Sequence, residues 1–306
     1  GLAMHNYHAT WKMFPGSNMQ WNWSGAYLTG KWSPQAQMLP YLENRAIANS
    51  LNYNFNPNPW GQSGAFNANT TAVWQKVEVF VCPSDSITNT GSDRPGNNYR
   101  YSFGTVPRGQ RGGDGFFWMN APGRVGRKDR DILDGLSNTA AFSERLQPPS
   151  VSGVFREKNR SIFGINGGAV FPLTNQSNPQ IQEQGLVLAA EQCRQAGSPM
   201  TQANSTGVAN DWNTRYDSRG GFWGNSNSHA VGYNHVMTPN QKSCCIIGGW
   251  GSGSAGAATA SSNHPGGVNV LFGDGSVRFI SDNIDQPTWW AFGTISKQEV
   301  VDATSL

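Results

Sequence analysis

The sequence contains little charge. Of its 306 residues only 13% are Asp, Glu, Lys or Arg, about half the usual share. The 22 Lys and Arg residues outnumber the 19 Asp and Glu residues, so the net charge is only +3, and this surplus is not clustered. Nucleic-acid-binding proteins depend on clustered basic charge, so that class is excluded. The polar surface must therefore come from Asn, Gln, Ser, Thr and Gly.

The sequence also lacks a long apolar run and a zinc-type cysteine pattern. No stretch approaches the roughly 18 apolar residues that cross a bilayer. The four cysteines are Cys82, Cys193, Cys244 and Cys245, and none stands in Cys-x-x-Cys spacing, which argues against a zinc site of that kind. In an oxidising compartment Cys193 would pair with Cys244 or Cys245; the alternative is four buried thiols.

Glycine, proline and tryptophan are abundant instead. The 37 Gly and 17 Pro residues indicate many turns and exclude a helical bundle or coiled coil. The 12 Trp residues supply enough apolar surface to exclude intrinsic disorder. This composition favours an exported protein over a cytosolic enzyme.

Periodicity predicts an N-terminal helix followed by several strands. Apolar residues at three- and four-residue spacing predict a helix over 1–13, a second helix is expected from 40 to about 50, and another within 181–195. Alternation predicts strands at 77–82, 99–103 and 139–143. We expect a single domain over 1–306, with a helical part at 1–58, a first β region at 73–146, a loop-rich insertion at 147–260 and a C-terminal hairpin and tail at 261–306.

The most specific local signal is a hairpin near the C-terminus. Two apolar segments, 268–272 and 277–280, flank the turn residues Gly273, Asp274, Gly275 and Ser276. Asp-Gly is typical of a two-residue type I′ turn. That register pairs Phe272 with Val277 and Val270 with Phe279, and it places all four side chains in the core.

At this hairpin the sequence resembles a known family. The segment from Ser261 to Ile280 contains His264-Pro265-Gly266-Gly267 and then Asp274-Gly275, a His-x9-Asp-Gly motif. It is similar to a family of prepilin-type exported proteins of unknown function, related to type IV pilins and pseudopilins. Further blocks resemble that family in the same order, namely 1–8, 39–43, the Cys-Pro-Ser-Asp corner at 82–85, Asp-Gly-Leu-Ser-Asn-Thr at 134–139 with Glu144, and 288–301.

The resemblance implies a pilin-like head of α+β class. An N-terminal helix would pack on an antiparallel β-sheet, and the head would bear long loops. Family members begin with a prepilin peptidase site and a long apolar helix, so roughly 40–50 residues would precede Gly1. The implied role is a non-catalytic subunit of an extracellular or cell-surface filament. Its partners would be copies of itself or related subunits, with no nucleic acid and no cofactor, and its membrane contact would be through that helix alone.

Several residues could be catalytic or could bind a metal, but each also has a structural interpretation. A His264–Asp274 dyad is disfavoured, because an extended strand between them separates the motif ends by roughly 17 Å. We therefore expect His264, Pro265, Gly266, Gly267, Asp274 and Gly275 to form a corner and a turn. His5 and His8 have a spacing that could present two metal ligands, but packing is the preferred interpretation. The sequence thus predicts no catalytic residue and no metal site.

Two alternatives remain open. Asp85, Asp114, Asp134 and Glu144 could form paired carboxylates in a secreted hydrolase, or hold Ca²⁺ through loop oxygens, although their contexts are typical of turns and caps. An extracellular carbohydrate- or solute-binding module would instead use aromatic platforms. The candidates for those platforms, which could equally be core or subunit contacts, are Trp21, Trp23, Trp212, Trp223, Trp250, Trp289 and Trp290.

Overall fold

The structure is a computed structural model, and it describes residues 1–17, 32–55, 57, 69–85, 96–106, 113–117, 126–147, 159–165, 179–199, 223–226, 231–246 and 256–297. The helices are α1 (Leu2–Trp11), α2 (Pro34–Met38), α3 (Arg45–Ser50), α4 (Thr70–Val73), α5 (Pro179–Gln195) and α7 (Gln286–Gly293). Among these residues no helix is long and apolar enough to span a membrane.

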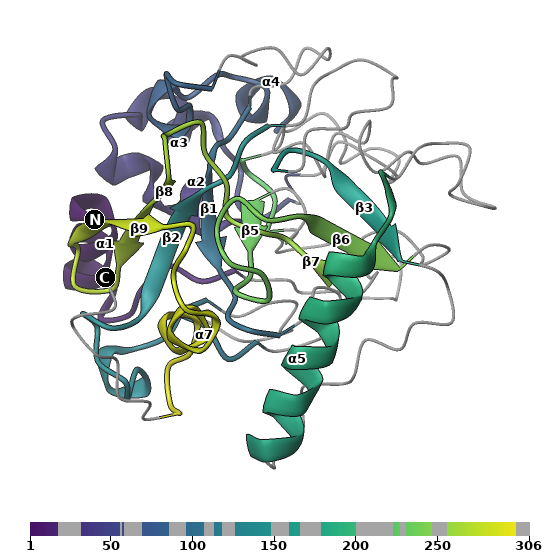
Figure 1. Cartoon of the computed structure of the whole chain (residues 1–306). Coiled ribbons are helices and arrows are strands. Elements are labelled where there is room, and N and C mark those ends of the chain that lie inside the picture. Colours follow the sequence, from purple (N-terminus) through teal and green to yellow (C-terminus); the bar gives the residue numbers. More distant parts are fainter. Residues whose placement is uncertain are drawn as a thin grey trace, which may run out of the picture.

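Two sheets organise the chain. The strands are β1 (Tyr99–Ser102), β2 (Ala140–Glu144), β3 (Ile162–Ile165), β4 (Ser198–Pro199), β5 (Gly232–Tyr233), β6 (Ser243–Ile246), β7 (Gly256–Ala257), β8 (Gly267–Phe272) and β9 (Val277–Ser281). One sheet has the order β5-β1-β2-β8-β9 and the other β4-β3-β6-β7. In Figure 1, α1 and the β8–β9 hairpin lie on one side of the molecule, and α5 lies with β3 and β6 on the other.

The α+β class and the N-terminal helix are confirmed, but the sheets are mixed rather than antiparallel. β1 pairs parallel with β5, and β3 pairs parallel with β6. The other strand pairs are antiparallel. Parallel pairs need long crossover connections, and the loop-rich stretch 147–260 provides them.

Two apolar clusters hold the elements together. The first packs helices α1 to α4 against β1 and β2, with Tyr101, Phe117 and Trp223 fully or almost fully buried. The second fills the space between β8, α5 and α7, where Phe272 and Trp289 have no exposed surface. β8 lines the second cluster with alternate residues, so it is the strand around which the C-terminal half packs.

The expected strand at 77–82 is wrong. The chain there forms a 3-10 helix over Glu78–Phe80 instead. Val77 and Phe80 are buried while Val79 is 50% exposed, so the buried residues are three apart rather than two. A spacing of three residues between buried side chains is the period of a 3-10 helix, which has three residues per turn.

The hairpin forms, but in a different register. The turn residues are Gly273, Asp274 and Gly275, because the Gly275 N–H donates to the Phe272 carbonyl and the Phe272 N–H donates to the Ser276 carbonyl. Gly275 has φ 90°, so this is a three-residue loop with a left-handed glycine rather than a two-residue type I′ turn.

This register corrects half of the predicted hairpin core. Leu271 pairs with Val277 and Val270 pairs with Arg278. A one-residue shift moves every side chain of a strand to the opposite face. Val270 and Phe272 are buried as expected, whereas Val277 is 64% exposed and Phe279 is 50% exposed.

Candidate functional site

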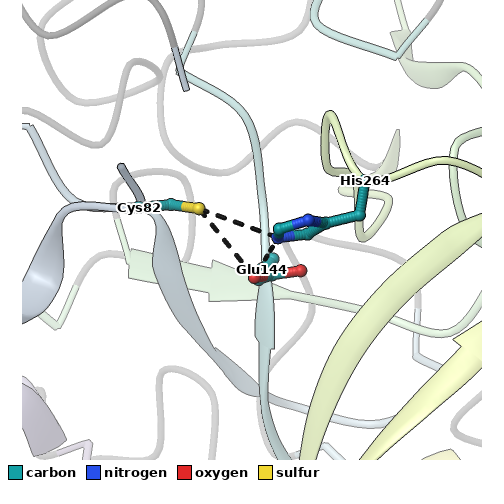
Figure 2. A group of neighbouring side chains, drawn as sticks. All are labelled: Cys82, Glu144 and His264. Atoms are coloured by element: carbon teal, nitrogen blue, oxygen red, sulfur yellow. Dashed lines mark hydrogen bonds and ion pairs between the residues drawn. The ribbon is translucent and has the colours of Figure 1, made fainter. Parts of the chain in front are cut away.

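Three segments that are distant in sequence meet at the beginning of β8. Cys82 follows the 3-10 helix Glu78–Phe80, Glu144 is the last residue of β2, and His264 precedes β8. β2 pairs with β8, and this pairing brings Glu144 beside the His264 loop. Figure 2 shows the three side chains directed toward one another. We call them the Cys–Glu–His cluster.

The three donor atoms converge on one point. His264 Nε2 lies 3.2 Å from Glu144 Oε1. Cys82 Sγ lies 4.0 Å from each of these two atoms. Among the described residues, this is the one group of three His, Cys, Asp or Glu side chains with donor atoms within 4.8 Å of one another.

The geometry differs from that of a nucleophilic triad. In a triad the base uses one ring nitrogen for the nucleophile and the other for the orienting acid. Here the same nitrogen of His264 faces both Cys82 and Glu144. The acid therefore cannot orient the ring while that nitrogen takes the thiol proton. The arrangement is that of three ligand atoms around a shared point.

Backbone and amide groups fix the carboxylate in place. The Asn269 backbone N–H donates to Glu144 Oε2 at 2.8 Å. The Asn269 side-chain amide donates to Oε1 at 3.2 Å. Cys82 and Glu144 are buried, while the His264 side chain is 33% exposed. The cluster is thus closed on the Cys and Glu side and reaches solvent at the imidazole.

The phenol of Tyr99 borders the cluster. Burial, together with the neighbouring Cys82 and Glu144, raises the pKa of Tyr99 to about 12. The phenol is therefore a neutral hydroxyl group at physiological pH. Ser84 lies on the other side of the thiol, with its Oγ 3.0 Å from Cys82 Sγ.

A buried ion pair supports the same corner. Arg160 Nη1 donates to Asp85 Oδ1 at 2.7 Å, and both side chains are almost completely buried. The Asn98 amide and the Gln147 backbone N–H donate to Asp85 Oδ2 at 2.7 and 2.9 Å. Arg160 also donates to Asn263, the residue before His264, at 3.3 Å. The charge pair therefore ties the Cys-Pro-Ser-Asp corner to the His264 loop.

The outer face of the β8–β9 hairpin carries apolar side chains, of which Val277 and Phe279 are exposed and Leu271 is half-buried against the first apolar cluster. Leu271, Val277 and Phe279 share the outer face of the hairpin, since Leu271 pairs with Val277 and Phe279 pairs with Asn269 of β8. We call these three residues the hairpin face. Gly1 lies against it, because a Cβ added to Gly1 would be 3.3 Å from a Leu271 methyl carbon. The next residue, Leu2, is 78% exposed.

The remaining motif residues lie in turns. Asp274 accepts hydrogen bonds from the Ser276 backbone N–H at 2.9 Å and its hydroxyl at 2.7 Å. These bonds help to lower the pKa of Asp274, although partial burial opposes them. Pro265 and Gly266 are exposed, and Gly267 begins β8. His264 and Asp274 thus stand at opposite ends of one strand.

The other candidate ligands do not join one site. His8 Nε2 contacts Asp129 at 2.5 Å, whereas the ring of His5 lies near Gly275. Asp114 accepts hydrogen bonds from Thr105, and Asp134 accepts one from the Lys297 backbone N–H. Asp114 thus caps a nearby loop, whereas Asp134 holds the segment after α7 through Thr294 and Lys297. They form no convergent cluster within the part of the chain that the structure describes.

The predicted tryptophan platforms are only partly described. Trp223, Trp289 and Trp290 are buried in the core, so they offer no open surface for a sugar. Trp21, Trp23, Trp212 and Trp250 lie outside the described residues. Of the cysteine alternatives, Cys193 forms a disulfide with Cys244, and Cys245 remains outside it.

Sequence reasoning missed the Cys–Glu–His cluster. Cys82 and His264 are 182 residues apart, and no local spacing relates them. The available signal was that three separate motif blocks, at 82–85, 134–144 and 264–275, all contain residues that can bind a metal. One residue from each block joins the cluster. Convergence of those blocks on one corner was the missing step.

The comparisons with known proteins give a family without an assigned activity. Residues 1–287 match the family SBP_bac_10, described as "Protein of unknown function (DUF1559)". No curated protein and no solved structure matches the chain. Because the match covers nearly all of its residues, the chain belongs to the DUF1559 family.

Proposed function

We propose that this DUF1559 protein is a structural subunit of an extracellular, pilus-like filament and catalyses no reaction. The observation that carries the proposal is the hairpin face, an apolar surface on the outermost strand of a sheet. Val277 and Phe279 are 64% and 50% exposed, and Leu271, which pairs with Val277, lies near Gly1 at the beginning of α1. Contiguous apolar surface on a polar protein is typical of an interaction site.

The edge of β9 adds backbone pairing to this surface. β9 pairs with β8 on one side and ends the described sheet on the other. An edge strand presents N–H and C=O groups that can pair with another chain. In the described part of β9, Arg278 is the one charged residue, and its guanidinium lies 4.3 Å from the Phe272 ring centroid. That charge is engaged with Phe272 and does not shield the outer apolar face.

The proposed occupant is a second copy of this chain. Its contact on the hairpin face would be heterologous, because a contact between two different surfaces does not close on itself and generates a filament. The beginning of α1 lies beside the hairpin face, because a Cβ added to Gly1 would contact Leu271.

The disulfide supports the proposed location. Cys193 of α5 is bonded to Cys244 of β6, and disulfides persist in secreted and surface proteins. The proposal accordingly places this domain outside the cytoplasm.

Sedimentation of the purified chain tests the proposal. The double variant Val277→Ser, Phe279→Ser should self-associate at least tenfold more weakly than the wild type, since each serine removes exposed apolar surface from the contact. Leu133→Ser is the matched control, because Leu133 is 62% exposed but lies outside the hairpin face. Equal association of all three proteins would contradict the proposal. So would a wild type that stays monomeric at high concentration and binds an oligosaccharide.

A further inference from the structure

We propose that the Cys–Glu–His cluster binds one Zn²⁺ ion and that this ion crosslinks the three segments that meet at the beginning of β8. The inference does not depend on filament assembly, because none of the three ligands belongs to the hairpin face, although Phe279 of that face pairs with Asn269, which holds Glu144. It adds a binding site to a chain for which the sequence predicted no metal.

The ligand types fit zinc. Zn²⁺ is bound by Cys sulfur, His nitrogen and carboxylate oxygen, at about 2.3, 2.0–2.1 and 2.0–2.2 Å respectively. Hard cations such as Ca²⁺ and Mg²⁺ prefer oxygen ligands alone. A thiol and an imidazole in the same donor set therefore favour zinc over calcium.

The distances fit a tetrahedral centre with a small adjustment. Tetrahedral angles and these bond lengths place a nitrogen and an oxygen ligand about 3.3 Å apart, and sulfur about 3.5 Å from each. The observed separation of His264 Nε2 and Glu144 Oε1 is 3.2 Å, which is already suitable. Cys82 Sγ lies 4.0 Å from both atoms, so it must approach by about half an ångström.

The surroundings orient the ligands as metal sites require. Groups behind a metal ligand hold it in position and tune its basicity. Asn269 binds both oxygens of Glu144, and its backbone N–H occupies Oε2, so Oε1 is the oxygen presented to the cluster. The His264 side chain is 33% exposed, and we expect a water molecule from solvent to be the fourth ligand.

Proton balance makes binding depend on pH. Zinc requires a thiolate, so the Cys82 thiol releases its proton to solvent when the ion binds. The ion takes the Nε2 lone pair of His264, and the neutral imidazole then carries its proton on Nδ1. Glu144 binds as the carboxylate. No bond is oxidised or reduced, and affinity should fall as the solution becomes more acidic.

Metal titration of the purified chain tests the site. The disulfide must stay intact, so the protein is stripped with a chelator under anaerobic conditions without a reductant. Co²⁺ should bind with one equivalent and give a thiolate-to-cobalt charge-transfer band, and Zn²⁺ should displace it. Zn²⁺ should also raise the urea midpoint of unfolding, because it binds the folded state.

Variants separate the proposed site from adventitious binding. Cys82→Ser should abolish the charge-transfer band, and His264→Gln should weaken Zn²⁺ binding by more than about 100-fold. Asn269→Ala acts behind a ligand and should weaken it by about 10- to 100-fold. Cys245→Ser is the matched control, because Cys245 is a buried cysteine outside both the cluster and the disulfide, and it should bind like the wild type.

Two results would overturn the inference. One is a wild-type protein that binds less than one equivalent of Zn²⁺. The other is His264→Gln binding as tightly as the wild type; because His264 is one-third exposed, this variant should fold even if Cys82→Ser does not. Loss of zinc binding with self-association unchanged would leave the filament proposal intact, and the converse holds for the hairpin-face variants.

Discussion

The two ends of strand β8 differ in almost every physical respect. At its beginning, polar and charged side chains from distant segments are buried and hydrogen bonded, including Glu144 and the Asp85–Arg160 pair. At its far end, Leu271 and its partner Val277 lie on the outer face, and Val277 is 64% exposed. Burial of polar groups and exposure of apolar groups both cost free energy unless a partner compensates. The comparison indicates that the beginning of β8 is stabilised by contacts within the chain, whereas the far end is suited to contacts with another chain.

The comparison predicts unequal costs for two phenylalanines on this hairpin. Phe272→Ala should lower the free energy of unfolding by about 3–5 kcal/mol, because the ring is fully buried. Phe279→Ala should lower it by less than about 1 kcal/mol, because half of that side chain is in solvent. Urea unfolding measures both. Equal losses would restore the two-residue turn register, in which both rings are buried.

The charged corner should be almost as sensitive. Arg160→Met removes the buried Asp85–Arg160 ion pair and should cost about 3–5 kcal/mol. Lys76→Met is the control, since Lys76 pairs with Glu78 at 2.9 Å on the surface and should cost less than about 1 kcal/mol. If chemical denaturation shows the two variants to be equally stable, the Asp85–Arg160 pair does not hold the corner.

Stability should fall in acid because of a buried histidine in the core beneath β8. Burial lowers the pKa of His235 to about 3, against the ordinary 6.5, although its hydrogen bond to the Trp289 carbonyl opposes the shift. Between pH 6.5 and pH 3 the unfolded chain therefore binds a proton that the folded chain does not. Stability decreases by about 1.4 kcal/mol for each pH unit below 6.5 from this residue alone.

The substitution His235→Gln isolates that contribution. The pKa values of Asp129 and Asp274 are lowered in the folded chain, so protonation of these residues in acid also destabilises the protein. The pH dependence of wild-type stability therefore has several sources. Denaturation midpoints measured from pH 7 to pH 4 should depend less steeply on pH in the variant. Parallel curves for the two proteins would show that His235 is protonated in the folded state.

The smallest of these effects concerns the turn that joins the two strands. Gly275 has φ 90°, and Gly275→Ala should cost about 1–2 kcal/mol because L side chains rarely adopt this conformation. Gly197→Ala is the control, because nothing lies within 4 Å of a Cβ added there. Thermal unfolding should separate the two variants. If Gly275→Ala is as stable as the control, the turn does not require a left-handed residue.

The helices and strands that depend on local sequence patterns could be predicted from the sequence. Helix α1, helix α5 and strands β1, β2 and β8 follow from apolar periodicity and were expected at nearly the observed residues. The hairpin register was not predictable in the same way, because Gly-Asp-Gly-Ser admits both a two-residue and a three-residue turn. The difference of one residue decided whether Phe279 faces the core or the solvent.

The Cys–Glu–His cluster depends on tertiary structure alone. Glu144 reaches His264 because β2 pairs with β8, and that pairing links residues more than 100 positions apart. Periodicity carries no information on such pairs. The alternation at 77–82 was misleading for a related reason: tertiary contacts buried Val77 and Phe80 together and produced a 3-10 turn before Cys82.

Electron microscopy of the native protein tests the central claim most directly. The account predicts helical polymers in which this head repeats along the axis and strand β9 of each subunit lies against its neighbour. Discrete single particles, with Val277 and Phe279 facing solvent at concentrations where the protein is functional, would contradict it.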